Sequence, residues 1–148
     1  MTDWGEDDAP AAELGDLDQN DLAEVEPTLY YGSVDEFVRE YLRNVYRRKI
    51  DGTHRVWAAR FWEYDEALIR IEALWRAWEQ LRLDAGTGMS TWWRDHADHH
   101  MPVLMDPDGP FSAAPEHDEN KSKKGAPLPY VEPPEGMFPD VRLSTDGD

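Results

Sequence analysis

The middle of the chain carries the clearest pattern of apolar and polar positions. From about residue 65 to residue 83, apolar side chains recur at intervals of three and four residues, which is the period of one helix face. They are Tyr64, Ala67, Ile71, Leu74, Trp78 and Leu81, flanked by Leu68 and Trp75. Gly86 follows, and a glycine at that place favours a left-handed helix end. The pattern predicts a helix over residues 65–83.

A second helix is predicted on the N-terminal side of the first. Ser33 and Glu36 have the spacing of a capping box, in which each side chain accepts a hydrogen bond from a free amide of the first turn. The following apolar residues keep helical spacing, and Gly52 interrupts the run. They are Val34, Phe37, Val38, Tyr41, Leu42, Val45 and Tyr46.

A third helix is predicted from Thr87 or Ser90, either of which can cap it, to about Met101, since Pro102 disfavours continuation. Residues 53–63 carry Trp57, Phe61 and Trp62 without a clean period, so an irregular or short helical connector is expected there. Residues 106–110 form a strong turn signal. Because no alternating strand of useful length occurs, the predicted fold is all-α, a small domain of three main helices over residues 29–114.

Charge separates this domain from its flanks. Residues 1–28 hold ten acidic residues and no Lys or Arg, which predicts a disordered acidic arm, because such a segment buries too little apolar surface to offset its ordering entropy. Residues 115–148 hold six Pro and a net charge of −4, which predicts a disordered Pro-rich acidic tail. Six of the seven Trp lie between the flanks, where their burial can build a core.

Composition narrows the classes of function. The chain has no Cys, which excludes a disulfide framework, a thiolate metal site and a cysteine nucleophile. No stretch approaches the roughly 18–20 apolar residues that cross a bilayer, and the N-terminus is acidic where a signal peptide is basic. These features predict a soluble, cytoplasmic protein without a membrane partner. A formal net charge of −17 disfavours nucleic acid overall.

The predicted third helix concentrates the side chains most suited to binding. On a regular helix His96 and His100 share one stripe with Trp92, and Asp95 lies on the neighbouring stripe. We take this face as the predicted surface for a partner protein, the alternative being a structural role at the edge of the core. Its residues are Trp92, Trp93, Arg94, Asp95, His96 and His100.

Catalysis has weaker support. Two His four residues apart can share a zinc ion, but the remaining ligands would have to be carboxylates such as Asp95, Asp98 or Glu63. Ala97 stands where the H-E-x-x-H motif requires its general base. The sequence also lacks a phosphate-binding glycine loop, a nucleophile elbow and a dinucleotide fingerprint. We therefore expect no enzyme, metal or cofactor, and a small metal-dependent hydrolase is the weakest alternative.

A basic, aromatic stretch supports a different alternative, nucleic-acid binding. Arginines interleaved with aromatic rings can hold phosphates and stack bases. The candidate contacts are Arg47, Arg48, Lys49, Arg55 and Arg60, among Tyr46, Trp57, Phe61 and Trp62. The plainer interpretation is a helix C-terminus followed by core residues. One further hypothesis is that the acidic arm covers this stretch as a mimic of a polyanion.

Four segments carry a distinctive pattern. They are residues 29–33 (Leu-Tyr-Tyr-Gly-Ser), 74–79 (Leu-Trp-Arg-Ala-Trp-Glu), 88–96 (Gly-Met-Ser-Thr-Trp-Trp-Arg-Asp-His) and 106–111 (Asp-Pro-Asp-Gly-Pro-Phe). In them the chain resembles domain-of-unknown-function family 4913 over about residues 29–111. The resemblance implies an actinobacterial gene of a mobile element, such as a plasmid or phage, and it implies no activity.

These observations lead to one main hypothesis. The protein is expected to be a non-catalytic acidic adaptor, monomeric or weakly dimeric, that binds another protein through the face of its third helix. The resemblance places it in a mobile-element process such as conjugative transfer. The runner-up is a nucleic-acid-binding accessory protein that uses the basic connector.

Overall fold

The computed structural model describes residues 28–142. The predicted disordered arm lies outside the described residues except for Thr28, and the last six residues of the predicted tail also lie outside them. Among the described residues, no helix is long and apolar enough to cross a membrane.

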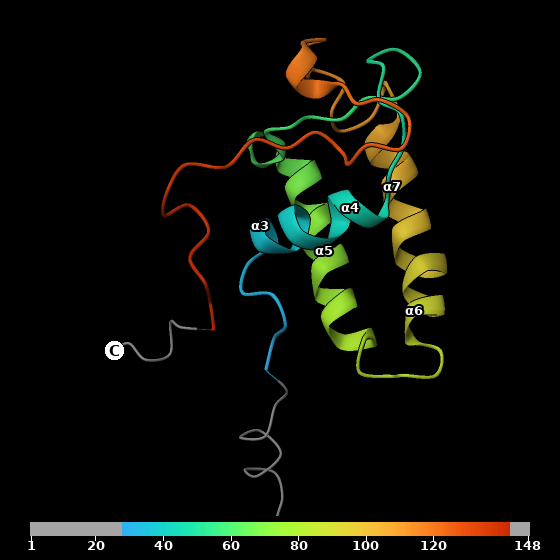
Figure 1. Cartoon of the computed structure of the whole chain (residues 1–148), viewed down its shortest axis with the longest axis vertical. Helices are drawn as coiled ribbons and strands as arrows, with labels where there is room; N and C mark the ends of the chain where they lie inside the picture. Colours follow the sequence, from blue (N-terminus) through green and yellow to red (C-terminus); the bar gives the residue numbers. More distant parts are fainter. Residues whose placement is uncertain (1–27, 143–148) are drawn as a thin grey trace, which may run out of the picture.

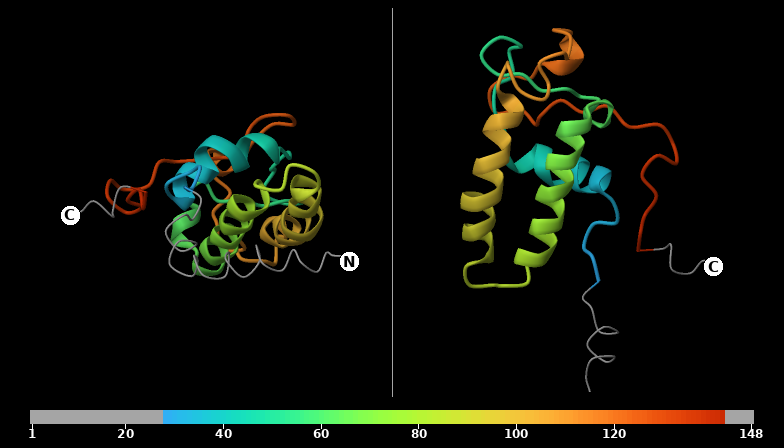
Figure 2. Two further views of the ribbon diagram at one scale, coloured as in Figure 1. Left: turned by 90° about the horizontal axis from the view of Figure 1, so that it is seen from below. Right: turned by 180° about the vertical axis from the view of Figure 1, so that it is seen from behind.

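Two antiparallel helices stand side by side, and a third helical segment lies across them (Figures 1 and 2). The upright pair consists of α5 (Asp65–Leu81) and a continuous run of α6 (Gly88–Thr91), the π-helical turn η3 (Trp92–Ala97) and α7 (Asp98–Met105). The crossing segment consists of α3 (Val34–Phe37), the π-helical turn η1 (Val38–Leu42) and α4 (Arg43–Val45). Two short 3₁₀ turns are η2 (Phe61–Glu63) and η4 (Asp118–Asn120). Residues 28–142 contain no strand, so the all-α prediction is confirmed.

The crossing segment begins at the predicted capping box. The Ser33 hydroxyl accepts a hydrogen bond from the Glu36 amide at 3.1 Å, which satisfies a free donor of the first turn. The Glu36 carboxylate accepts from the amide of Gly32 at 2.8 Å, one residue before the cap. The predicted start is therefore confirmed, with the reciprocal bond displaced by one residue.

The α5 helix matches its prediction within two residues at its C-terminus. Its apolar stripe faces the protein's own core, because Ala67, Ile71, Leu74 and Trp78 are all buried. The prediction for Gly86 is wrong, since among the glycines of residues 28–142 only Gly52, Gly125 and Gly136 have positive φ. The turn is instead held by the Asp84 carboxylate, which accepts from the amides of Gly86 and Thr87.

The third helix is longer than predicted. It continues past Pro102 to Met105, although proline removes one hydrogen bond of the helix. Met101 and Leu104 are fully buried on either side of Pro102, and Met105 is nearly so. Their burial offsets the missing bond, so the helix does not end where its local propensity falls.

The connector after the crossing segment agrees with its prediction. Residues 53–63 are irregular except for η2, and Trp57, Phe61 and Trp62 are buried. Main-chain bonds tie this segment to its surroundings, including one from the Val56 amide to the Met105 carbonyl at 3.0 Å. The connector is thus part of the core.

The predicted disordered tail is wrong for residues 115–142. The amide of Leu128 donates to the carbonyl of Arg43 at 3.0 Å, and the Leu128 side chain is fully buried. Asn120, also buried, accepts from the amide of Ala59 at 2.8 Å through its side chain. A Pro-rich segment has few amides to satisfy, so an extended path with a few apolar anchors suffices to hold it. The segment runs over one end of the helix pair and down one side (Figures 1 and 2).

Candidate functional site

Trp92 does not belong to the surface of the third helix. Its side chain is fully buried, and its indole N–H donates to the carbonyl of Leu74 at 3.0 Å. The sequence-based stripe assumed 3.6 residues per turn, whereas the wider π turn η3 places Ala97, five residues on, on the same buried side. Trp92 is therefore removed from the predicted partner-binding residues.

Trp93 is half-buried and packs edge to face against Trp92 at the border of the core. Its ring lies parallel to that of Tyr46, with 5.7 Å between centroids. The guanidinium of Arg48 lies over the Tyr46 ring at 4.1 Å. The three side chains connect the third helix to the basic stretch, two regions that the sequence analysis treated as separate candidates.

The neighbouring polar residues pair with one another. Arg94 and Asp95 are exposed and form an ion pair at 2.8 Å, and the bond from Arg94 lowers the pKa of Asp95. His96 and His100 are half-buried. The Arg70 guanidinium donates to Nδ1 of His100 at 3.1 Å. Burial lowers the pKa of His100, and the nearby His99, Arg70 and His96 lower it further.

Neither histidine is part of a metal site among the described residues. Within residues 28–142, no three side chains of His, Asp or Glu are grouped closely enough to hold a metal ion. The suggested carboxylate ligands Asp95, Asp98 and Glu63 are thus not gathered around the histidines. The metal-dependent hydrolase lacks a ligand set in this part of the chain.

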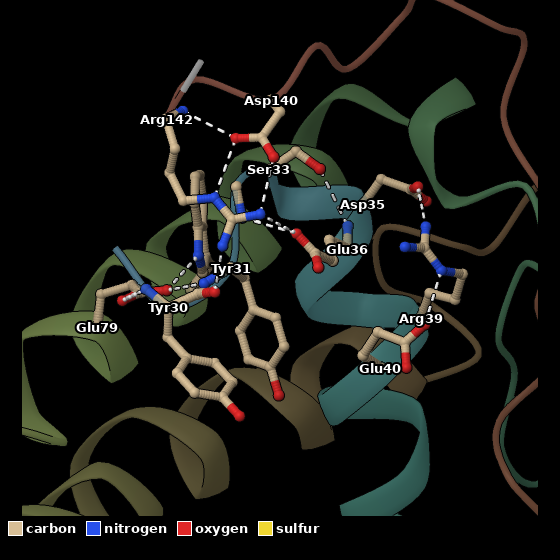
Figure 3. Close-up of polar contacts among 12 residues, drawn as sticks. Tyr30, Tyr31, Ser33, Asp35, Glu36, Arg39, Glu40, Glu79, Asp140 and Arg142 are labelled. Carbon is tan, nitrogen blue, oxygen red and sulfur yellow. Dashed lines mark hydrogen bonds and ion pairs between the residues drawn. The ribbon is translucent and has the colours of Figure 1, made fainter. Parts of the chain in front are cut away.

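The most extensive polar cluster surrounds Glu79, near the C-terminus of α5 (Figure 3). Glu79 is 5% exposed, and its carboxylate accepts four hydrogen bonds. The donors are the amides of Tyr30 and Tyr31, the indole of Trp75 and the guanidinium of Arg82. The bonds from Tyr30 and Tyr31 join the start of the domain to α5, and those from Trp75 and Arg82 lie within α5 and its C-terminal cap, so we assign this cluster a structural role.

Two further contacts attach the ends of the described chain to the same region. Arg142 donates to the carbonyl of Tyr30 at 2.7 Å and lies 3.3 Å from the Glu36 carboxylate. Asp35, a residue of α3, is buried and accepts from the Tyr130 hydroxyl at 2.7 Å. Burial raises the pKa of Asp35, and burial together with this bond raises the pKa of Tyr130 to about 12. These contacts hold the C-terminal segment against the start of the domain, so we assign them a structural role as well.

The aromatic residues of the basic stretch are not available to a ligand. Trp57 and Phe61 are each 1% exposed, and Tyr46 is covered by Arg48 and Trp93. Among the predicted cations, Arg60 is bound to Glu119 at 3.0 Å. The base-stacking part of the nucleic-acid prediction is therefore wrong, because these rings build the core.

The tertiary structure adds three lysines to the remaining cations. Ile50 and Ser122 form an antiparallel bridge with bonds of 3.0 and 3.1 Å, and Arg47 donates to the carbonyl of Gly125 at 2.9 Å. These contacts place the lysines of residues 121–124 beside residues 47–49. We call the combined group the basic ridge: Arg47, Arg48, Lys49, Arg55, Lys121, Lys123 and Lys124.

Two hollows border the basic ridge. One, of about 420 Å³, is lined by Lys49, Lys121 and Lys123 together with Asp51 and Asp118. The other, of about 330 Å³, lies between residues 46–55 and the end of α7. Its lining includes Tyr46, Arg48, His54, Arg55, Met105 and Asp106. The sequence analysis singled out only the cations of residues 47–60. Nothing in the sequence signals that residues 121–124 would join them, since 60 residues lie between the two segments.

The model of one family, described as "Domain of unknown function (DUF4913)", matches residues 31–134. The chain therefore belongs to this family. The match extends beyond residue 111, so it includes most of the C-terminal segment that packs on the helices. Neither the curated proteins nor the solved structures include a significant match.

Proposed function

We propose that this member of the DUF4913 family is a non-catalytic adaptor that binds an acidic segment of a partner protein on the basic ridge. One observation carries the proposal. None of the seven ridge cations forms an ion pair with a carboxylate among residues 28–142, although the chain has a net charge of −17. Six other arginines do form such pairs: Arg39, Arg60, Arg70, Arg82, Arg94 and Arg142.

An acidic polypeptide fits the basic ridge better than a nucleic acid does. Arginine binds carboxylates through two parallel N–H donors, so a run of Asp and Glu is a good complement for this surface. The net negative charge of the protein would repel the continuous row of phosphates of a nucleic acid. The rings of the connector are buried, so they offer its bases no surface for stacking.

The exposed side of the third helix extends the same surface. Trp93 reaches the basic ridge through Tyr46 and Arg48, and the Arg94–Asp95 pair lies one residue further on. We include Trp93, Arg94, Asp95, His96 and His100 as secondary contacts of the partner. The sequence analysis placed the whole binding surface on this face, whereas the basic ridge is now its main part. The cytoplasmic location and the mobile-element setting stay predictions of the sequence and of the resemblance.

The test is a capture experiment with two matched variants in the full chain. The ridge variant is Lys121→Gln with Lys123→Gln, and the control variant is Arg76→Glu. Both changes lower the net charge by two, and all three side chains are exposed and form no ion pair within residues 28–142. Each tagged protein is incubated with native host lysate, with and without nuclease, and retained proteins are identified by mass spectrometry.

The proposal predicts a protein that survives nuclease treatment, is retained by the wild type and the control variant, and is lost with the ridge variant. Added salt should weaken its retention, since exposed charge pairs are screened. Retention by the ridge variant would assign the contact to another surface. Recovery that disappears with nuclease would favour the nucleic-acid alternative.

A further inference from the structure

The basic ridge has no ion-pair partner within residues 28–142, whereas the N-terminal segment is rich in acidic residues. Residues 1–27 contain ten Asp and Glu and no Lys or Arg. The seven ridge cations make no ion pair with a carboxylate of residues 28–142. The chain therefore contains both a cationic surface without ion pairs to residues 28–142 and an acidic polypeptide of the kind proposed above as its ligand.

The N-terminal segment is long enough to reach the basic ridge. It joins the domain at Thr28, whose carbonyl accepts from Arg82 at 2.7 Å near the C-terminus of α5. The segments that carry the ridge lie toward the opposite end of α5 (Figure 1). The 17 residues of α5 span about 25 Å, whereas 27 residues can extend to about 90 Å.

From this combination we infer that residues 1–27 bind the basic ridge in cis and compete there with the acidic segment of a partner. The inference rests on the proposed function, because it concerns the occupant of the same surface. A tethered ligand acts at an effective concentration in the millimolar range, so weak contacts suffice for substantial occupancy. Exposed charges interact over only about 8 Å at physiological salt, so the occupancy decreases as salt is added.

A direct test places a spin label on the N-terminal segment of the full chain. The chain has no native Cys, so Ala12→Cys provides a unique labelling site. We expect paramagnetic broadening of the amides of residues 48–55 and 121–125 at low salt. It should persist in the control variant Arg76→Glu and disappear both in the ridge variant and at high salt. Mixing labelled protein with unlabelled, isotope-enriched protein separates contacts within one chain from contacts between copies.

A competition test measures the consequence for a ligand. The probe is a fluorescent peptide with the sequence of residues 1–27, and its binding is followed by anisotropy. In an arm-neutral variant, all ten acidic residues of the segment are changed to Asn or Gln within the full chain. We expect this variant to bind the probe about tenfold more tightly than the wild type, because the competing segment has lost its charge. Combining the arm-neutral and ridge changes should abolish this gain.

The outcomes separate the two proposals. Equal probe affinity for the wild type and the arm-neutral variant, without broadening at the ridge, would overturn the cis contact and leave the proposed function standing. Broadening only in the mixed sample would assign the contact to a second copy and overturn the inference in its cis form. If the arm-neutral variant does not bind the probe even at low salt, the basic ridge takes no acidic segment, and both proposals are wrong.

Discussion

The cluster around Glu79 and the basic ridge use charge in opposite ways. The Glu79 carboxylate is buried and accepts four hydrogen bonds, two from the amides of Tyr30 and Tyr31 and two from side chains of α5 and its C-terminal cap. The ridge cations lie in solvent or on ring faces and main-chain carbonyls, without ion pairs to the described residues. A buried charge is stable only when it is fully paired, whereas an exposed cation is stabilised by water and stays ready for a ligand.

This contrast separates structural from binding residues in the protein. Removing the Glu79 side chain leaves several groups of its cluster without a hydrogen-bond partner. Its loss should therefore lower the free energy of unfolding. The side chains of the ridge lysines have no hydrogen-bond or ion-pair partner within residues 28–142, so their loss should appear in binding alone. The four predictions below test this division, in order of decreasing effect.

The largest effect is expected for Trp92→Ala. The substitution leaves a cavity in the core and removes the indole bond to the Leu74 carbonyl, so we expect the free energy of unfolding to fall by about 3–5 kcal/mol. Its neighbour Trp93 is half-buried, so Trp93→Ala should cost clearly less. Urea denaturation of both variants measures the difference. Equal costs would place Trp93 in the core as well and remove it from the binding surface.

Glu79→Gln is expected to come next. The amide keeps the shape of the carboxylate but puts an N–H group among four donors, so a cost of about 3 kcal/mol follows from lost charged hydrogen bonds. The control is Glu72→Gln on the exposed side of the same helix, with an expected change within about 0.5 kcal/mol. Thermal unfolding of the two variants gives the comparison. A small cost at Glu79 would mean that the cluster is not structural.

A smaller, pH-dependent effect is expected at His100. Its pKa lies below the ordinary value of 6.5, chiefly through burial, so the unfolded chain binds more protons than the folded one just below that pH. The contribution to stability is therefore complete above pH 6.5 and is lost as the pH falls through the folded pKa. Proton NMR titration measures this pKa, and Arg70→Gln should raise it part of the way back. An unchanged pKa in that variant would leave burial and the other histidines as its causes.

The smallest effect is expected for the ridge variant Lys121→Gln with Lys123→Gln. Both side chains are exposed and without ion pairs to the described residues, so the free energy of unfolding should change by less than about 0.5 kcal/mol. Urea denaturation at low and high salt provides the measurement. A loss above about 1 kcal/mol would show that the lysines support the fold, and the contrast with Glu79 would fail.

Local patterns predicted the helices because the relevant interactions lie within a few residues of one another. The Ser33 cap and the apolar stripe of α5 follow from spacing that the chain itself displays, and the irregular connector follows from aromatic residues that lack a regular period. The same reasoning failed at Pro102 and Trp92. There, burial of Met101 and Leu104 overrode the helix-ending signal, and a π turn changed the register that a regular helix would have.

By itself, the sequence determined the fold class, the family and the composition of the candidate sites. Only the tertiary structure decided how those sites are arranged: it buried Trp92, paired Arg60 with Glu119, and brought Lys121 and Lys123 beside Lys49. The physical reason is the range of the interactions. Helix periods and caps act over three or four residues, whereas the Ile50–Ser122 bridge that assembles the basic ridge depends on the packing of the whole domain.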